Sequence, residues 1–187
     1  MILVAGHLCL DLFPPLGPTP LDPGRLVEAG PMTASPGGCV ANVGTALRLL
    51  GTETKLVGAF GDDALGTWLS SLLPGLHRLP IAGSTSYSVV LSAPGRDRTF
   101  LHHPGLNAQF DPARFPRSAL PEARWLHFGY PPLMRTVYAD GGRALAALFR
   151  DARAAGLGTS LDLSWPDPAS HSGRADWAGR RRRSRAG

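Results

Sequence analysis

The feature that most restricts the fold of this chain is a regular alternation of short apolar segments with helical ones. Residues 1–6 (MILVAG) form an apolar run that is too short for a helix and ends on glycine, which predicts a buried strand. Residues 40–51 (VANVGTALRLLG) carry apolar side chains at offsets of three, seven and ten from Val40, which predicts an amphipathic helix that Gly51 ends. The same reasoning predicts strands at 54–60, 124–129 and 158–164, and helices at 62–73, capped by Asp62 or Asp63, and 142–156.

Alternating strands and helices predict an α/β fold with a largely parallel sheet flanked by helices. Two segments depart from this pattern. Residues 12–36 are rich in proline and glycine, with a strand-like piece at 25–30, and residues 84–104 alternate apolar and polar side chains around Pro94-Gly95, as a β-hairpin does. We expect these segments to form a small inserted β-sheet that covers a ligand crevice as a lid.

The charge of the chain is concentrated at its end. The 187 residues are 43% hydrophobic and 18% charged, which is typical of a globular protein, and the net charge is +5. All of this excess positive charge lies beyond residue 170, where the sequence has six arginines and one acidic residue, Asp176. We therefore expect residues 1–170 to form the folded domain and residues 171–187 to be a disordered or frameshifted tail, with a nucleic-acid-binding or targeting segment as the disfavoured alternative.

Other features indicate a cytoplasmic protein without a membrane partner. No stretch reaches the roughly 18 apolar residues of a membrane span, and the N-terminus lacks the basic region and cleavage site of a signal peptide. Cys9 and Cys39 follow no metal or redox spacing, which predicts free thiols and no metal site.

Two adjacent glycines, Gly37 and Gly38, stand where the helix at 40–51 begins. The first N–H groups of a helix lack intrahelical partners, so glycines there let an oxygen-rich ligand approach the backbone. Asn42 lies one turn further and offers both a donor and an acceptor, which suits a hydroxyl group. The alternative is a tight turn followed by a surface asparagine.

Several motifs together resemble those of the ribokinase-like, PfkB-type carbohydrate kinases over residues 1 to about 170. The resemblance is carried by residues 37–66 (GGCVANVGTALRLLGTETKLVGAFGDDALG), 4–13 (VAGHLCLDLF), 102–110 (HHPGLNAQF), 126–130 (LHFGY) and 159–168 (TSLDLSWPDP). It implies a ribokinase-like fold whose C-terminal part is missing here.

The resemblance also implies roles for particular residues. Asp11 would bind sugar hydroxyls, and Gly37, Gly38 and Asn42 would contact the sugar from the other side. Asp162 would lie near the nucleotide and magnesium, so ATP and Mg²⁺ are the implied cofactors. From the lid, the candidates to close over the sugar are Tyr87, Val89 and His102.

The chain departs from the family in its chemistry. The late motif aspartate-threonine-x-glycine-alanine-glycine-aspartate, which supplies the catalytic base, is absent, as is the asparagine-x-x-glutamate motif associated with magnesium. Residues 58–63 (GAFGDD) precede the lid hairpin and do not replace it, although Asp62 and Asp63 are the first carboxylates to test if the chain proves active.

The expected function is therefore that of an ATP-dependent sugar kinase, here truncated and inactive, with no catalytic residue of its own. The alternative is a non-catalytic sugar-binding or regulatory remnant. A dinucleotide-binding oxidoreductase is disfavoured because no G-x-G-x-x-G follows the first strand. A small sugar is the expected partner, with dimerisation through the lid or through an unpaired edge near residues 158–164.

Overall fold

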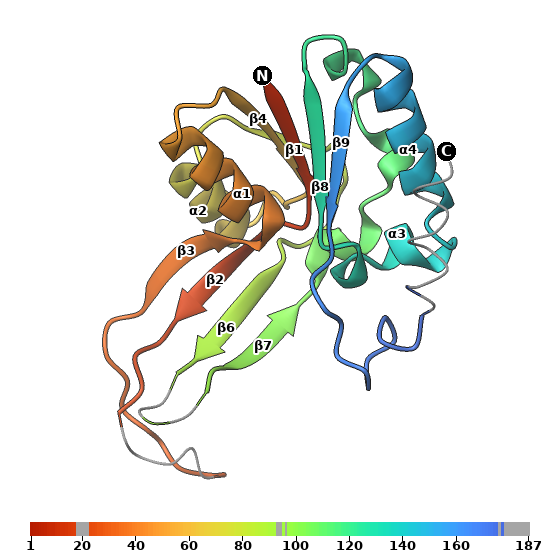
Figure 1. Ribbon diagram of the computed structural model, residues 1–187. Coiled ribbons are helices and arrows are strands. Elements are labelled where there is room, and N and C mark those ends of the chain that lie inside the picture. Colours follow the sequence, from red (N-terminus) through yellow and green to blue (C-terminus); the bar gives the residue numbers. More distant parts are fainter. Residues whose placement is uncertain (18–22, 93–94, 96, 176, 178–187) are drawn as a thin grey trace.

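The computed structural model describes residues 1–17, 23–92, 95, 97–175 and 177. They build two sheets, one enclosed by helices and one projecting from its end (Figure 1). The main sheet has the order β5-β4-β1-β8-β9, and all its described pairings are parallel. Its strands are β1 (Ile2–Gly6), β4 (Thr54–Gly58), β5 (Leu76–Arg78), β8 (Trp125–Gly129) and β9 (Gly158–Asp162).

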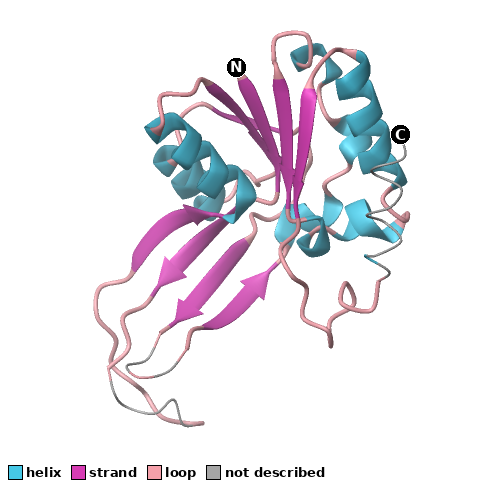
Figure 2. Ribbon diagram, viewed as in Figure 1, coloured by secondary structure: helices cyan, strands magenta, loops and turns pink. Residues whose placement is uncertain are grey.

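Helices cover both sides of the main sheet (Figure 2). On one side lie α1 (Gly38–Leu49) and α2 (Ala64–Leu72), and on the other α3 (Arg135–Ala139) and α4 (Arg143–Ala154). Short 3-10 helices are η1 (Gly105–Gln109), η2 (Pro112–Arg114), η3 (Arg117–Ala119) and η4 (Pro131–Leu133). The predicted α/β architecture and its strand and helix sites are thus confirmed, whereas β5, α3 and the 3-10 helices were not predicted.

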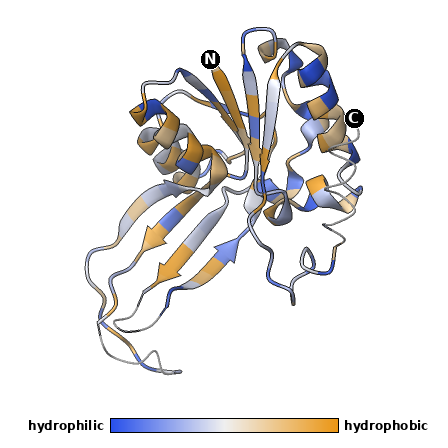
Figure 3. Cartoon of the chain, in the orientation of Figure 1, coloured by the Kyte–Doolittle hydropathy of each residue, from blue (hydrophilic) through white to orange (hydrophobic). Residues whose placement is uncertain are grey.

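The central strand β1 explains why the N-terminal segment is apolar throughout. Leu3 and Ala5 point into the core shared with α4, and Val4 points into the core shared with α1 and α2. A strand buried on both faces has no polar alternation, and β1 stands out as a hydrophobic strand in Figure 3.

The ends of the helices follow the predicted signals with small corrections. Gly51 has φ 73° and its N–H donates to the Arg48 carbonyl at 3.0 Å, so it closes α1 as expected. Leu50 is 79% exposed, because it lies at the C-cap rather than on the buried stripe. Asp63, and not Asp62, is the N-cap of α2 and accepts a hydrogen bond from the Gly66 N–H.

The lid sheet is the projecting sheet, with the order β3-β2-β6-β7. Its strands are β2 (Cys9–Phe13), β3 (Thr33–Gly37), β6 (Tyr87–Leu91) and β7 (Thr99–His103). The predicted hairpin is confirmed as the antiparallel pair β6–β7, although residues 93, 94 and 96 of its turn lie outside the described residues.

Two corrections to the lid follow from the structure. The lid begins at Cys9 rather than residue 12, because the chain leaves the main sheet after Gly6 and enters β2. Asp11 therefore lies on a lid strand and not at the end of the first main-sheet strand. The expected strand at 25–30 is reduced to one antiparallel bridge between Leu16 and Ala29.

The last described segment packs against α3. The ring of Tyr138 lies 5.7 Å from that of His171 and 6.0 Å from that of Trp177, centroid to centroid. Ser172 is buried, and its carbonyl accepts a hydrogen bond from Trp177 Nε1 at 2.7 Å. The predicted boundary at residue 170 therefore falls inside these contacts, whereas residues 176 and 178–187 of the predicted tail lie outside the described residues.

Within the described ranges, no helix is both long and apolar enough to cross a bilayer.

Candidate functional site

The carboxyl ends of β1, β8 and β9 meet the beginning of α1 at one point. The His7 N–H donates to the Gly129 carbonyl at 3.0 Å, and the Tyr130 N–H donates to the Asp162 carbonyl at 3.0 Å. From α1, the Val40 N–H donates to the His7 carbonyl at 3.1 Å. The chain builds the sheet outward from β1 in both directions, so this is the topological switch point, where α/β sheets bind ligands.

Asp11 and Gly37 lie diagonally across the β2–β3 pair, in which Cys9 is the direct partner of Gly37 and Ser35 that of Asp11. The Asp11 carboxylate accepts a hydrogen bond from Cys9 Sγ at 3.2 Å. A Cβ at Gly37 would overlap this carboxylate, although the φ of Gly37, −127°, suits any residue. Gly37 is therefore required by the space that Asp11 occupies, which modifies the expectation that this glycine serves only to admit a ligand.

Gly38 has the same relation to His7. Its φ of 82° lies in the left-handed region, and a Cβ there would stand 2.5 Å from His7 Nδ1. The two glycines thus let two side chains of this chain, a carboxylate and an imidazole, reach the N-terminus of α1.

His102 reaches the same place from the lid. Its Nδ1 lies 3.0 Å from Ser88 Oγ, and its ring centroid lies 5.5 Å from that of His7. Asp11, Ser88 and His102 are partners in the register of β2, β6 and β7, so they share one face of the lid sheet. Burial lowers the pKa of His102, and the nearby Asp11 carboxylate partly opposes this.

Asn42, Tyr130 and Asp162 complete the group. Burial raises the pKa of the Tyr130 phenol, hydrogen bonding with Asn42 lowers it, and the Asp162 charge raises it again. Tyr130 has φ 62°, a left-handed conformation that is rare outside glycine. Burial together with the Asp162 charge raises the pKa of Cys39 to about 12, so its thiol stays protonated.

Tyr87 and Val89 are not brought to this group. Side chains alternate along β6, and Ser88 already points toward the face that carries Asp11. Tyr87 instead packs with the core beneath α1 and α2, and its ring lies 5.3 Å from that of His103. The structure thus places these two residues on the face of β6 opposite Asp11, and their closing over a sugar stays a prediction.

Sequence reasoning missed His7, Ser88 and Tyr130. Ser88 could have been found from the alternation of side chains along the strands, because Asp11 and His102 indicate which face of the lid sheet is polar and Ser88 falls on that face. His7 stands between a buried strand and the lid (GHLCL), but nothing in its neighbours along the chain shows that its ring is enclosed.

Asp62 and Asp63 have structural partners. The carboxylate of Asp62 forms an ion pair with Arg78, with one hydrogen bond at 2.9 Å. Asp63 accepts hydrogen bonds from the backbone and hydroxyl of Thr85 at 2.7 and 2.6 Å. Burial opposes ionisation of Asp63, but these hydrogen bonds and that from Gly66 hold its pKa below the usual range.

A second polar array lies beside Asp162 on β8 and β9. Trp125 Nε1 donates to Ser160 Oγ at 2.8 Å, and this hydroxyl lies 2.8 Å from His127 Nδ1. The indole N–H only donates, so the Ser160 hydroxyl accepts from it, and the same hydroxyl can donate to Nδ1 or accept from it according to the tautomer of His127. Burial lowers the pKa of His127, opposed by the Asp162 charge.

Asp162 is the carboxylate for which the family resemblance implies a place near magnesium. No three His, Cys, Asp or Glu residues gather into a metal site in the part of the chain that the structure describes. Mg²⁺ in phosphoryl-transfer sites is held through one or two carboxylates together with phosphate oxygens and water molecules, so a single carboxylate such as that of Asp162 is compatible with the implied ion.

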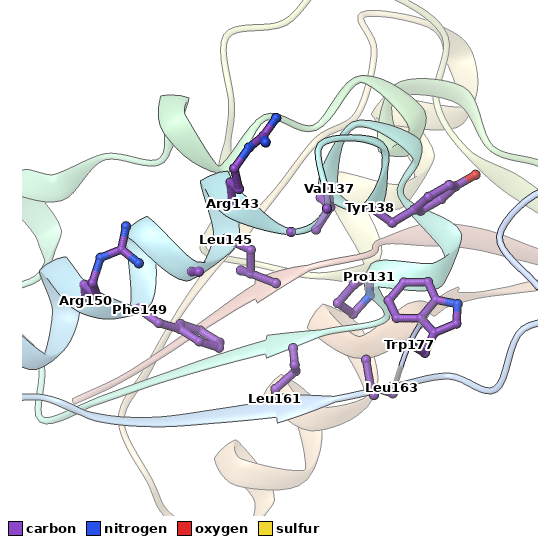
Figure 4. Close-up of a pocket in the computed structure, with 13 residues that line it drawn as sticks. Pro131, Val137, Tyr138, Arg143, Leu145, Phe149, Arg150, Leu161, Leu163 and Trp177 are labelled. Atoms are coloured by element: carbon purple, nitrogen blue, oxygen red, sulfur yellow. The ribbon is translucent and has the colours of Figure 1, made fainter. Parts of the chain in front are cut away.

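An apolar cavity lies elsewhere, between α3, α4 and the edge strand β9 (Figure 4). Its volume is about 360 Å³, and its walls are mainly apolar, including Val137, Leu145, Phe149, Leu161, Leu163 and Trp177. None of the predicted site residues lines it. We place the candidate site at the switch point because polar groups converge there. The cavity beside β9 has mainly apolar walls, which suit packing against another apolar surface.

Comparison with known proteins identifies the family. Residues 1–176 match the family model described as "pfkB family carbohydrate kinase". Fructokinase-2 of Zea mays is 28% identical over 181 residues, which cover 90% of this chain and 52% of the relative. The chain thus spans about half the length of this curated relative.

Solved structures agree on the fold. A PfkB protein from Polaromonas sp. JS666 superposes with a TM-score of 0.73 at 20% identity, over 98% of this chain and 61% of that one. A fructokinase from Xylella fastidiosa with bound ATP gives a TM-score of 0.70 at 23% identity, over 98% and 57%. The ribokinase-like fold and its partial extent are thereby confirmed.

Proposed function

The chain belongs to the pfkB family of carbohydrate kinases, and we propose that it forms the side of such a kinase that binds the acceptor sugar. In the complete reaction, the γ-phosphoryl group of ATP would pass to a carbohydrate hydroxyl. Because the curated relatives are named fructokinases, fructose is the first sugar to test.

The observation that carries this proposal is the convergence of Asp11, Asn42 and His102 at the switch point. A carboxylate offers only acceptors and binds two neighbouring hydroxyls well, while an amide both donates and accepts. The N-terminus of α1 adds backbone N–H groups on the same side. These groups suit a polyhydroxy ligand better than an apolar one.

Turnover is not expected from residues 1–187. Phosphoryl transfer needs a base near the acceptor hydroxyl and fixed dipoles around the phosphoryl group, and the family motif that supplies both is absent from the sequence. Asp162 is proposed to face the nucleotide side. Asp162 is also the residue of this chain that would help to hold Mg²⁺, which would neutralise phosphate charge when bound with ATP.

A non-catalytic sugar-binding or regulatory remnant remains the second candidate. Both candidates predict the same sugar binding, so a binding experiment cannot separate an interrupted kinase from a remnant. The DNA sequence downstream of the coding region can. A glycine-alanine-glycine-aspartate motif in another reading frame downstream would favour an interrupted kinase, and its absence would favour a remnant.

We also propose a cytoplasmic location and self-association through the lid. On β7, an edge strand, Phe100 and Leu101 are 54% and 56% exposed. Replacing both with serine should reduce any dimer seen by analytical ultracentrifugation, and an unchanged dimer would exclude the lid.

The test of the proposed function is sugar binding by the purified chain. Isothermal titration calorimetry with fructose, ribose and glucose should find one sugar that binds, and Asp11→Asn should weaken that binding by about 1.5–3 kcal/mol. Glu53→Gln, an exposed carboxylate on another surface, is the matched control. Equal affinity for Asp11→Asn and the wild type would remove Asp11 from the site.

ADP release should stay at background with every sugar. A rate in the ordinary kinase range of about 1–100 per second would instead show that this chain carries a base of its own.

A further inference from the structure

His7 occupies the turn where the chain passes from the main sheet to the lid. Its N–H and its carbonyl are both held, by Gly129 and by Val40. The backbone position of His7 is therefore fixed from β8 and from α1, and its side chain projects from a rigid point.

The imidazole of His7 is enclosed and has no hydrogen-bond partner in the described part of the chain. The residue is 2% exposed, and neither Nδ1 nor Nε2 is paired. Its ring neighbours are His102 at 5.5 Å and Tyr130 at 6.0 Å. A buried polar group without a partner is costly and rare in folded proteins, so this ring indicates a ligand that the fold is built to receive.

The protonation state of the His7 imidazole restricts the class of ligand that it can bind. Burial, with a smaller contribution from His102, lowers the pKa of His7 to about 3. A neutral imidazole has one N–H donor and one acceptor nitrogen. That pair matches a hydroxyl group, which also donates and accepts, whereas an anion would find only one donor.

We propose that His7 is a further sugar-binding residue that selects the acceptor by hydrogen-bonding one of its hydroxyls, beside the hydroxyls held by Asp11. This inference rests on the proposed function. Gly38 would be glycine partly to keep the His7 ring in place, because any Cβ there meets Nδ1.

The test compares two replacements of His7. His7→Leu removes both nitrogens at similar volume, and His7→Gln keeps a donor and an acceptor. Calorimetry with fructose should show at least about a tenfold loss of affinity for His7→Leu and a smaller loss for His7→Gln. His77→Leu, on the exposed face of β5, should bind as the wild type does.

A second readout separates binding from folding. Without sugar, His7→Leu should melt at or above the wild-type temperature, since it removes unpaired buried polar atoms, and fructose should no longer raise that temperature. In the wild type, ¹⁵N NMR should show a fructose-dependent shift at a His7 ring nitrogen, which keeps the test valid if a variant fails to fold.

The outcomes are distinguishable. If the wild type binds fructose and His7→Leu binds it equally, or the His7 nitrogens do not respond, then the ring is only core packing or holds a water molecule and the inference is overturned. If the wild type binds none of the sugars, the proposed function itself fails and this inference fails with it.

Discussion

The space above Gly37 is filled by the carboxylate of Asp11, and this contact yields a direct prediction. Gly37→Ala should destabilise the chain by about 1–3 kcal/mol, the usual cost of overpacking, because the new Cβ overlaps Asp11 while the backbone itself is unstrained. Urea unfolding followed by circular dichroism measures this loss. Gly17→Ala, which meets nothing within 4 Å, is the matched control.

A double-mutant cycle shows whether Asp11 is the cause. In an Asp11→Ala background the obstacle is gone, so Gly37→Ala should then cost much less than in the wild type. Additive losses would mean that the β2–β3 pair, and not the carboxylate, demands glycine.

The buried His7 makes a second residue-scale prediction, about pH. Its pKa is about 3 in the folded chain, against an ordinary value of 6.5 for a solvated histidine, so the unfolded state binds the proton more readily. Above pH 6.5 His7 is neutral in both states, and as the pH falls from 6.5 toward 3 only the unfolded state takes up the proton, so the folded chain loses stability. In that window the loss is about 1.4 kcal/mol per pH unit.

Comparison with His7→Leu isolates this contribution. Burial also lowers the pKa of His102 and of His127, so the variant should retain some acid sensitivity but show a shallower slope between pH 6 and 4. Parallel curves of unfolding free energy against pH would show that His7 is protonated or exposed in solution.

Individual site residues could be predicted only where a motif marked them. Asp11, Gly37, Gly38, Asn42 and His102 do gather at the switch point. Which face of its strand Tyr87 takes could not be predicted, because side-chain parity depends on where the strand starts, and a one-residue change in register reverses the face. His7 was missed because burial of a polar ring is a tertiary property.

Helix α2 depends on one side chain that serves two segments. Asp63 caps it through Gly66 and also binds Thr85 in the loop before β6. Asp63→Ala should therefore cost more than the roughly 0.5–2 kcal/mol of a lost N-cap, since the Thr85 N–H loses its partner as well. Thermal unfolding with Asp62→Ala as the neighbouring control should show a clearly smaller effect for the exposed Asp62–Arg78 pair.

Equal losses for the two aspartates would contradict this assignment. An Asp63→Asn variant refines the test, because asparagine caps helices nearly as well but presents only one acceptor oxygen to Gly66 and Thr85.

At the scale of elements, periodicity located most strands and helices but not the passage between sheets. The first strand ends at Gly6 as predicted, but the sequence did not show that Gly6, with φ 123°, turns the chain out of the main sheet and into β2. A Cβ at Gly6 would overlap the Gly129 carbonyl, so glycine is needed by a neighbouring strand that lies far away in sequence. Such a bend cannot be recognised from local composition.

At the scale of the whole molecule, β9 forms one of the two edges of the main sheet among the described residues. β9 pairs only with β8 among the described strands, and the apolar cavity beside it lies along α4. This agrees with the prediction of an edge near residues 158–164. The chain spans 52% of its Zea mays relative, and additional strands of a parallel sheet would extend this edge, which otherwise favours association.

The C-terminal segment sets where the packed part of the molecule ends. We predict that deleting residues 178–187 changes the free energy of unfolding by less than about 0.5 kcal/mol, the scale of surface changes, because this stretch is arginine-rich and has no apolar period. Deleting residues 171–187 should cost about 1–3 kcal/mol, since His171 and Trp177 then leave the ring of Tyr138. Both values come from urea titrations of the two truncated chains and the full chain.

A point variant identifies the contact responsible. Trp177→Ala in the full chain should reproduce a large part of the loss caused by the longer deletion, because the indole also donates to the Ser172 carbonyl. If the chain that ends at residue 170 is as stable as the full chain, the ring contacts contribute nothing, and the boundary indicated by charge alone is the correct one. If instead the shorter deletion already destabilises the chain, residues beyond 177 belong to the packed structure despite their charge.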